Sequence, residues 1–543
     1  MRHADLVVVE GDIRTMDVGV PRVQALAVTG GRVIALGRTE DIRSLAGPGT
    51  KVMDAGGRLV LPGFQDTHIH LADGGFKYSQ TCDLTRVRSP EALIAALAAY
   101  GGSHDQAWVN GTGWYSGVFG EHNLTRAVLD RAVPDRPCFI MASDGHNACM
   151  NSAGLAAVGI DAGTADPENG HFVRDTAGQP TGMLYERAVP WVMDRMPQPT
   201  DADYAMGLRW SQALANRHGI TGVIDAMVQE RHVRIYQALA KAGALTLRVG
   251  STALVSASDS TKAALERLSD FRADSFRADS REGLFRMHSA KFFLDGVVEN
   301  RTAAMIAPYA DTGGNAPLMF DPAQINEMFT AFDAARFQIH VHAIGDLATR
   351  AALDGMQAAR QANADWPSLH QIAHIQYIDP ADIPRFRALG VMANVQPLWA
   401  RHEASVTDIA VPAVGAERAQ WIYAFRSLLD AGAQMALSSD WGVSTLNPFE
   451  IIETAVTRQP PHKEGNCEAF LPGQRISRAE AVAGYTTAAA AAAWRSGDTG
   501  SLALGKYADL IMLDRDIFGC DVYDIGDTKV LLTLLAGREV WKA

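Results

Sequence analysis

The chain has 543 residues, of which 47% are hydrophobic and 20% are charged, and its formal net charge is -12. This balance is typical of a globular protein and, without a long basic run, argues against a nucleic-acid partner. No stretch approaches the ~20 apolar residues of a membrane span, and the N-terminus lacks the pattern of a signal peptide. Five scattered cysteines without CxxC spacing fit a reducing compartment. We therefore expect a cytoplasmic protein with no membrane partner.

The two ends of the chain share one kind of pattern. Residues 1–62 alternate short hydrophobic stretches of period two with glycine pairs, which is typical of a small antiparallel sheet. The same pattern returns in residues 497–543. Neither end has enough strands to bury one face of a sheet alone, so we expect the two ends to form a composite β-sandwich domain.

The middle of the chain, residues 63–496, repeats a strand that is usually followed by an amphipathic helix. Repetition of such units predicts an α/β fold, namely a (β/α)8 TIM barrel. The expected strands are residues 64–70, 221–226, 246–252, 286–292, 338–343, 371–376, 391–396 and 434–440.

The gap between the first and second expected strands is about twice what one unit of a barrel requires. We therefore expect an insertion spanning about residues 80–205, rich in Trp, Gly and Asn. An insertion after strand one emerges at the carboxyl ends of the strands, where the active sites of barrels lie. The segment is expected to act as a lid that contributes to substrate specificity.

The first expected barrel strand carries two histidines, His68 and His70, close to Asp66. Alternate side chains of a strand share a face, so both imidazoles can bind one metal ion. Imidazole is the commonest metal ligand in proteins. The alternative is that one or both histidines pack in a core, so the motif requires partners elsewhere in the chain.

Four other strands end with side chains that can bind metal, at the end of the barrel where catalysis occurs. They are Lys291, His342, His374 and Asp440. His342 is preferred to His340 because it lies nearer the carboxyl end of its strand. We expect His340 to be buried or to lie in a second layer around the metal.

Lys291 is the unusual member of this set, since an ammonium group repels a metal ion. A lysine that CO2 has carboxylated becomes an anionic ligand able to bridge two ions. The alternatives are that Lys291 is a substrate-binding cation or that it pairs with Asp295.

The chain resembles the amidohydrolase superfamily, and within it the branch of YtcJ-like proteins and N-substituted formamide deformylases, amidohydrolase family 3. The resemblance covers almost the whole chain. It rests on Leu61-Pro-Gly-Phe-x-Asp-x-His-x-His70, Gly111-Thr-Gly-Trp114, Asp144-Gly-His146, Gly182-Met-Leu-Tyr-Glu186, Lys291 to Asp295-Gly296, His342-Ala-Ile-Gly-Asp346, His374-Ile-Gln376, Ser439-Asp440 and Gly500-Ser-Leu-x-x-Gly-Lys506.

The resemblance implies a metal-binding TIM barrel with a composite β-sandwich. The metal positions of the superfamily correspond to His68, His70, Lys291, His342, His374 and Asp440. In binuclear members the carboxylated lysine bridges the ions, so one or two divalent ions are expected. Zinc is the first choice, with iron, manganese and nickel open. Homodimers are common among such relatives. The sequence departs from many relatives at Glu299, which adds a carboxylate near the mouth of the barrel.

The expected chemistry is attack by a metal-activated hydroxide. Asp440 would accept the proton of the water and deliver it to the leaving nitrogen. Asp66 and Asp346 are candidates to orient the histidines. Trp114, His146 and Arg301 are candidates for substrate contacts; the alternatives are lid packing, a loop hydrogen bond and a salt bridge, respectively.

The leading hypothesis is a hydrolase that acts on a non-peptide C–N bond of a small molecule, such as an amide or N-substituted formamide. The alternatives are ester, lactone or carbamate hydrolysis on the same site, an isomerase or decarboxylase, and a catalytically idle scaffold. The presence of every metal position and of the base argues against the idle scaffold.

Overall fold

The computed structural model describes residues 3–85, 87–119, 124–142, 147–278, 283–461 and 468–543. The chain divides into two compact units. The first unit comprises Met1–Ala72 and Arg209–Ala543, and the second comprises Asp73–Leu208. The second unit overlaps the segment of about residues 80–205 that the sequence suggests as an insertion, and those bounds stay a prediction. Among the described residues, no helix is long and apolar enough to cross a lipid bilayer.

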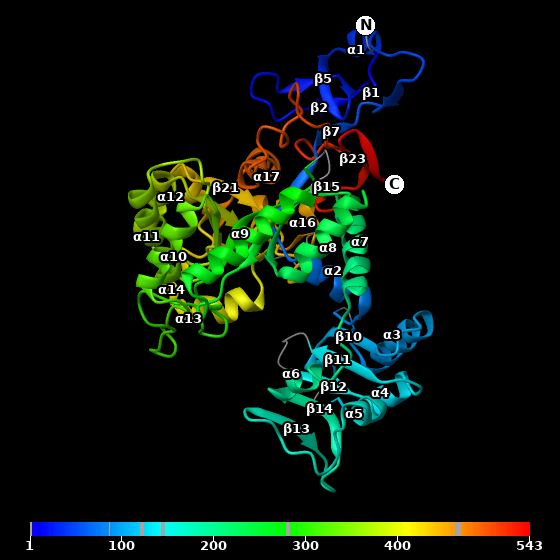
Figure 1. Ribbon diagram of the computed structural model, residues 1–543, viewed down its shortest axis with the longest axis vertical. Helices are drawn as coiled ribbons and strands as arrows, with labels where there is room; N and C mark the ends of the chain where they lie inside the picture. Colours follow the sequence, from blue (N-terminus) through cyan, green and yellow to red (C-terminus); the bar gives the residue numbers. More distant parts are fainter. Residues whose placement is uncertain (1–2, 86, 120–123, 143–146, 279–282, 462–467) are drawn as a thin grey trace. The chain divides into compact units, whose positions relative to one another are not determined.

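The first unit contains a parallel sheet of eight strands surrounded by helices (Figure 1). The TIM-like α/β fold expected from the sequence is confirmed. In sheet order, the strands are β21 (Gln434–Leu437), β20 (Met392–Val395), β19 (Gln371–His374), β18 (Gln338–Ala343), β17 (Phe285–Phe293), β16 (Arg248–Leu254), β15 (Ile220–Val228) and β8 (Phe64–Ile69). Their side chains are almost all buried, as is usual where helices cover a parallel sheet.

Helices follow the strands, and some of them begin at residues whose side chains cap the first turn. The Asp321 carboxylate accepts a hydrogen bond from Ala323 N at the start of one helix, and the Asn447 side chain does the same for Phe449 N at another. The helices are α7 (Asp201–Arg217), α8 (Glu230–Lys241), α9 (Thr261–Ala278), α10 (Pro322–Ala334), α11 (Asp346–Asn363), α12 (Ile383–Leu389), α15 (Phe425–Asp430), α16 (Pro448–Thr457), α17 (Arg478–Tyr485) and α18 (Thr487–Ala492).

The first and last barrel strands meet just beyond their ends. Asp440 N donates to His68 O at 2.8 Å, and His70 N donates to Trp441 O at 2.8 Å. The residues that close the barrel are therefore the expected ligands and one neighbour, so closure sets their backbone positions.

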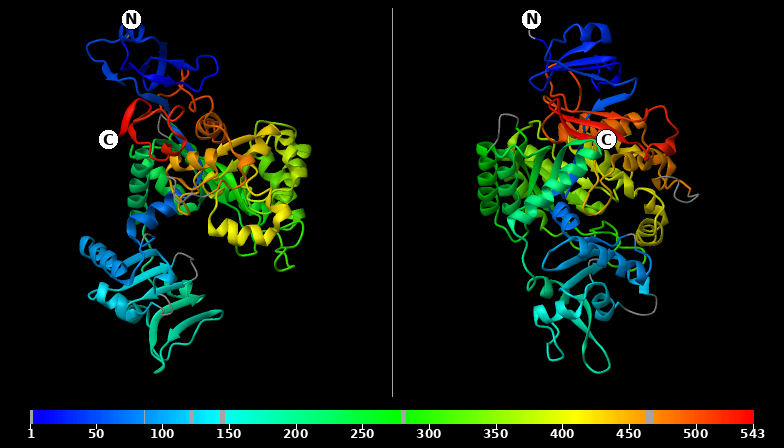
Figure 2. Two further views of the ribbon diagram at one scale, coloured as in Figure 1. Left: turned by 180° about the vertical axis from the view of Figure 1, so that it is seen from behind. Right: turned by 90° about the vertical axis from the view of Figure 1, so that its right-hand side faces the viewer.

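Strands from both ends of the chain share one sheet (Figure 2). In this sheet β22 (Leu510–Leu513) lies between β23 (Val530–Leu535) and β7 (Leu59–Pro62), followed by β2 (Asp12–Arg14) and β3 (Arg22–Val23), with β24 (Arg538–Lys542) at the other edge. A second sheet contains β5 (Arg32–Gly37), β4 (Ala25–Thr29), β1 (Leu6–Val9) and β6 (Lys51–Asp54). Leu6, Ile13, Leu510 and Leu532 belong to one hydrophobic core. The division at residues 62 and 497 stays a prediction.

A buried ion pair joins the barrel to this β-structure. Arg248, the first residue of β16, donates through Nε to Asp509 Oδ2 at 2.6 Å, and both side chains are buried. Asp509 Oδ1 also accepts from Ala536 N at 2.7 Å. Because Arg248 begins its strand, the pair lies at the end of the barrel opposite the expected ligands.

The second unit has a mixed sheet and a hydrophobic core of its own. In sheet order the strands are β13 (Gly170–Arg174), β14 (Pro180–Glu186), β12 (Asn147–Met150), β11 (Cys138–Ala142), β10 (Val109–Trp114) and β9 (Cys82–Asp83). Its helices include α3 (Pro90–Ser103), α4 (Arg126–Ala132), α5 (Ser152–Val158) and α6 (Ala188–Met193).

Candidate metal centre

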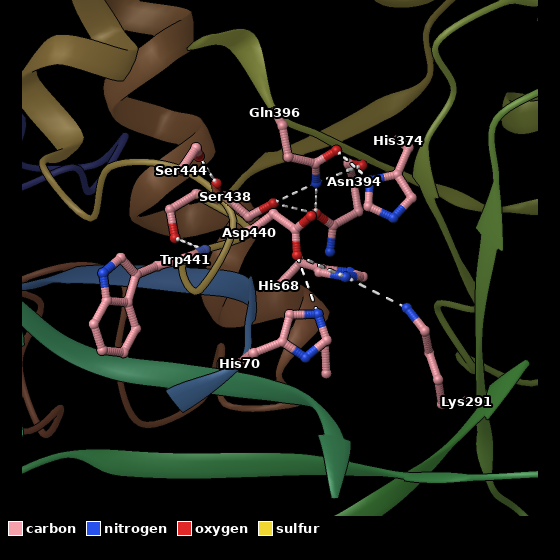
Figure 3. Close-up of polar contacts among 12 residues, drawn as sticks. His68, His70, Lys291, His374, Asn394, Gln396, Ser438, Asp440, Trp441 and Ser444 are labelled. Atoms are coloured by element: carbon pink, nitrogen blue, oxygen red, sulfur yellow. Dashed lines mark hydrogen bonds and ion pairs between the residues drawn. The ribbon is translucent and has the colours of Figure 1, made fainter. Parts of the chain in front are cut away.

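Three of the expected ligands converge on one point inside the barrel (Figure 3). Asp440 Oδ1 lies 3.2 Å from His70 Nε2 and 3.5 Å from His68 Nε2. All three ligand atoms lie within 4.8 Å of one another. The two histidines come from the end of β8 and the carboxylate from the segment after β21, which barrel closure brings together.

The remaining expected ligands lie beside this group. The rings of His342 and His374 have centroids 4.5 Å apart, and the ring of His374 is 4.9 Å from that of His68. Lys291 Nζ lies 3.4 Å from His68 Nε2. The six side chains therefore form one cluster, with Lys291 reaching its centre from β17.

The structure also decides against one alternative for Lys291. In the described part of the chain, no ion pair joins Lys291 to Asp295. The Asp295 carboxylate instead accepts from Ile344 N, Gly345 N and Ala304 N at 2.8–3.0 Å.

Buried partners fix the orientation of two histidines. His68 Nδ1 lies 2.8 Å from His340 Nε2, and His374 Nδ1 lies 2.9 Å from Gln396 Oε1. In both histidines the Nδ1 atom is thereby occupied, so Nε2 is the atom that remains for a metal. The expectation that His340 is buried behind the site is confirmed.

Gln396 belongs to a chain of polar groups inside the barrel (Figure 3). Its Nε2 donates to Ser438 Oγ at 2.8 Å, which in turn donates to Asn394 Oδ1 at 2.7 Å. Asn394 Nδ2 donates to Gln371 Oε1 at 2.8 Å. A continuous network of side-chain hydrogen bonds therefore holds His374 through Gln396. Sequence reasoning missed it, although amides in apolar strands were a usable signal, because buried amides require partners.

The expected roles of Asp66 and Asp346 as partners of the histidine rings are wrong. Asp66 Oδ1 accepts from two backbone N–H groups, those of His68 and Ser439, at 3.2 and 3.1 Å. Asp346 Oδ1 accepts from Ile306 N and Leu347 N. Both carboxylates therefore hold backbone N–H groups around the site, and in the described structure neither forms a hydrogen bond with an imidazole.

The backbone is strained where two ligands leave their strands. His374 has a φ of 77° and Asp440 a φ of 52°, which is the left-handed region that non-glycine residues rarely adopt. Ile375 N donates to Ala373 O across His374, a tight three-residue turn of the rare, strained form. Such strain persists only where surrounding contacts enforce it, and it is frequent at functional sites.

The electrostatics favour neutral imidazoles at His68, His342 and His374, which is the form that binds metal. Burial, reinforced by the Lys291 charge, lowers the pKa of His68 well below its usual value and that of His342 to about 3. Burial also lowers the pKa of Lys291 to about 7, against the attraction of Asp440. Burial depresses the pKa of His70 as well, but the Asp440 carboxylate outweighs it and the net shift is upward.

The residues present fit a divalent metal. Asp440 Oδ1 is buried and accepts no hydrogen bond of good geometry within the described structure, although it faces two imidazole nitrogens. A buried oxygen without a donor is costly unless a cation compensates it. Imidazole and carboxylate ligands suit zinc and neighbouring transition metals.

The candidate substrate residues have different surroundings. Trp114 is 1% exposed and packs in the core of the second unit. Arg301 pairs with Asp311, with its Nε donating at 2.9 Å. These contacts match the structural alternatives for the two residues, and their roles toward substrate stay predictions. His146 lies outside the described residues.

Fold and site together define a class: a TIM-like barrel with imidazole, carboxylate and lysine side chains gathered at the carboxyl ends of its strands. A model of the Amidohydrolase family matches residues 51–541. The chain belongs to this amidohydrolase family, and the expected family is confirmed.

Several known proteins are similar over nearly their whole length. Protein LONG AFTER FAR-RED 3 of Arabidopsis thaliana is 30% identical, with 99% of this chain and 92% of the relative covered. The N-substituted formamide deformylase of Arthrobacter pascens is 28% identical (98% and 97% covered), and the putative amidohydrolase YtcJ of Bacillus subtilis is 27% identical (98% of each). A solved structure of an uncharacterized metal-dependent hydrolase from Pyrococcus horikoshii has a TM-score of 0.77 at 23% identity, covering 95% of this chain and 99% of that one.

Proposed function

We propose that this protein is a metal-dependent hydrolase that cleaves a non-peptide carbon–nitrogen bond in a small amide or N-substituted formamide. One observation carries the proposal: the buried Asp440 carboxylate faces Nε2 of both His68 and His70, with Lys291 within 3.4 Å of His68. Family membership and the relative named N-substituted formamide deformylase support the reaction class.

His68, His70 and Asp440 would hold one divalent ion, and His342 and His374 would hold a second. A bound ion, zinc being our first choice, supplies water activation at neutral pH and polarises the scissile carbonyl. The proposal includes carboxylation of Lys291: neutral Nζ would attack the carbon of CO2 and release a proton to solvent, and the carbamate formed would supply anionic oxygen ligands for the ions.

Asp440 moves the proton in this scheme. Its carboxylate accepts a proton from the attacking water and delivers it to the leaving nitrogen. The leaving nitrogen requires this proton because an amide anion is a very poor leaving group. His340, Gln396 and the network behind them keep the imidazoles in the tautomer that binds metal.

We also propose a cytoplasmic location and a homodimer.

The test combines metal analysis with a substrate panel of formamides, amides, carbamates and esters. We expect at least one bound divalent ion per chain and turnover of formamides or amides. Asp440→Asn should abolish turnover while the fold and most of the metal remain. Asp430→Asn, at an exposed carboxylate on α15, is the matched control and should retain activity. Full activity without metal, or cleavage of esters alone, would overturn the proposal.

A further inference from the structure

A carboxylate at the mouth of the barrel is not used by the mechanism above. Glu299 lies in the turn after β17 and its side chain is half-buried. Its Oε1 accepts a hydrogen bond from Gln376 Nε2 at 2.8 Å. Gln376 is buried and follows β19.

The Glu299–Gln376 bond lies between two of the candidate metal ligands. Strand β18, which carries His342, separates β17 from β19 in the sheet. The loop after β17 reaches His342 through Gly296 O, which is 3.3 Å from His342 Nε2. On the other side, Gln376 follows His374 by two residues. The bond therefore crosses the carboxyl end of β18, beside the metal centre.

The neighbouring charged side chains are already paired. Arg301 pairs with Asp311 and donates through NH1 to the carbonyl oxygens of Val298 and Glu299. Glu403 pairs with Arg401 at 3.0 Å. In the described residues, by contrast, the only hydrogen-bond partner of the Glu299 carboxylate is a neutral amide, and it forms no ion pair, although Arg301, which is held by Asp311, also attracts it electrostatically.

The buried Arg458 is a further cation in this region, and two of its three nitrogens donate to backbone carbonyls, while its NH2 has no hydrogen-bond partner in the described structure. Its Nε donates to Phe470 O at 2.9 Å and its NH1 to Tyr423 O at 3.1 Å. No ion pair joins Arg458 to Glu299 in the described structure.

We infer that Glu299 binds substrate and selects molecules that carry an ammonium or other cationic group away from the bond that is cleaved. The inference rests on the proposed function, since it assumes that substrate reaches the metal centre through this mouth. A half-buried carboxylate that no cation contacts directly gains a charge-assisted hydrogen bond from such a substrate, whereas a neutral substrate leaves it without an ion pair. Arg301 then serves as a positioning residue that holds the loop presenting Glu299.

The experiment uses pairs of N-substituted amides that differ only at the end of the acyl chain, which is ammonium in one and methyl in the other. The ratio of kcat/KM for the two is measured in metal-loaded wild type, Glu299→Gln and Glu403→Gln. Glutamine at 299 keeps an oxygen for Gln376 and removes only the charge. Because Glu299→Gln removes the charge-assisted hydrogen bond to the ammonium group, we expect it to lower the ratio about tenfold or more. Glu403→Gln, whose carboxylate already has a cation, should leave it unchanged.

Wild type without preference for the cationic member, or a preference that survives Glu299→Gln, would overturn the inference. A second measurement distinguishes failure of this inference from failure of the proposed function. It is calorimetric binding of the two carboxylic acids that the amides would release. If no amide is cleaved, the ammonium-bearing acid should still bind metal-loaded wild type about tenfold more tightly than Glu299→Gln. Equal binding to both proteins would reject the role of Glu299 even if amides are hydrolysed.

Discussion

His68 Nδ1 and His340 Nε2 lie 2.8 Å apart inside the barrel. For His68 to present the lone pair of Nε2 to a metal, its Nδ1 must carry the proton and donate it to His340. His340 is fully buried, and it would set the tautomer of this proposed metal ligand without being a ligand itself.

Replacement of His340 should weaken metal binding. His340→Leu removes the acceptor for His68 Nδ1, and losses of this kind typically lower metal affinity about 10–100-fold. The measurement is competition with a chromogenic chelator, with circular dichroism to confirm folding. His370→Gln is the control, since His370 is a buried histidine that bonds to Asp333 and not to a ligand. Equal loss of affinity in both variants would show a general effect of destabilisation.

Removal of the lysine tests the bridge between the ions. Lys291→Ala should bind about one ion fewer per chain and lose at least about a hundredfold in activity, because several kcal/mol of charge stabilisation depend on the metal. A short carboxylate such as propionate, added to the variant, should partly restore both the metal content and the activity, because it supplies two oxygens in the space that the lysine side chain leaves. Metal content by mass spectrometry and turnover are the readouts. Unchanged metal content in Lys291→Ala would exclude Lys291 as a ligand.

Asp346 should make stability depend on pH. Burial raises the pKa of Asp346 to about 6 from 3.8, so the folded state disfavours the ionised carboxylate. Its contribution to stability is complete below about pH 4 and is lost as the pH rises through about 6. The Asn side chain does not titrate, so the difference in unfolding free energy between Asp346→Asn and wild type should shift in favour of the variant by on the order of 2–3 kcal/mol as the pH rises from about 4 to above 6.

Urea denaturation of the metal-free variant and of metal-free wild type gives their unfolding free energies, and the difference between the two is compared at about pH 4.5 and about pH 7.5. A difference that is independent of pH would assign the titration to another group.

The ion pair between Arg248 and Asp509 should stabilise the fold and leave the chemistry alone. Arg248→Met strands a buried carboxylate and should cost about 3–5 kcal/mol of unfolding free energy. The double variant Arg248→Met/Asp509→Asn should be more stable than Arg248→Met, since asparagine still accepts from Ala536 N and carries no charge. Thermal unfolding and turnover at saturating metal are measured in both. A double variant less stable than the single would mean that the pair is not the source of the loss.

Much of the fold follows from local sequence patterns. Each expected barrel strand is present because buried parallel strands leave long apolar runs, and because ligand side chains mark their carboxyl ends. The side chains of His68, His70, Lys291, His342, His374 and Asp440 could be grouped for the same reason. The positions of Lys291 and Asp440 relative to His68 are consistent with this grouping.

Other features depend on long-range contacts between side chains inside the barrel, and local sequence patterns do not predict such contacts. Asp66 and Asp346 were expected to hold imidazoles, but backbone N–H groups occupy them. Gln396 does hold an imidazole, through a network that joins separate strands. The pairing of Glu299 with Gln376 likewise arises only when strands β17 and β19 stand on either side of β18.

Closure of the barrel by the ligands has a consequence for synthesis. Ser439 N donates a hydrogen bond to Asp66 where the first and last barrel strands meet, and these two residues are 373 positions apart in the chain. During translation, His68 and His70 leave the ribosome long before Asp440 is made. A nascent chain therefore has the first histidines without their carboxylate, and a ribosome stalled before β21 carries a protein that cannot close its barrel. Under the proposed function, the ion is therefore bound only late in the biogenesis of this protein, after the barrel has been completed.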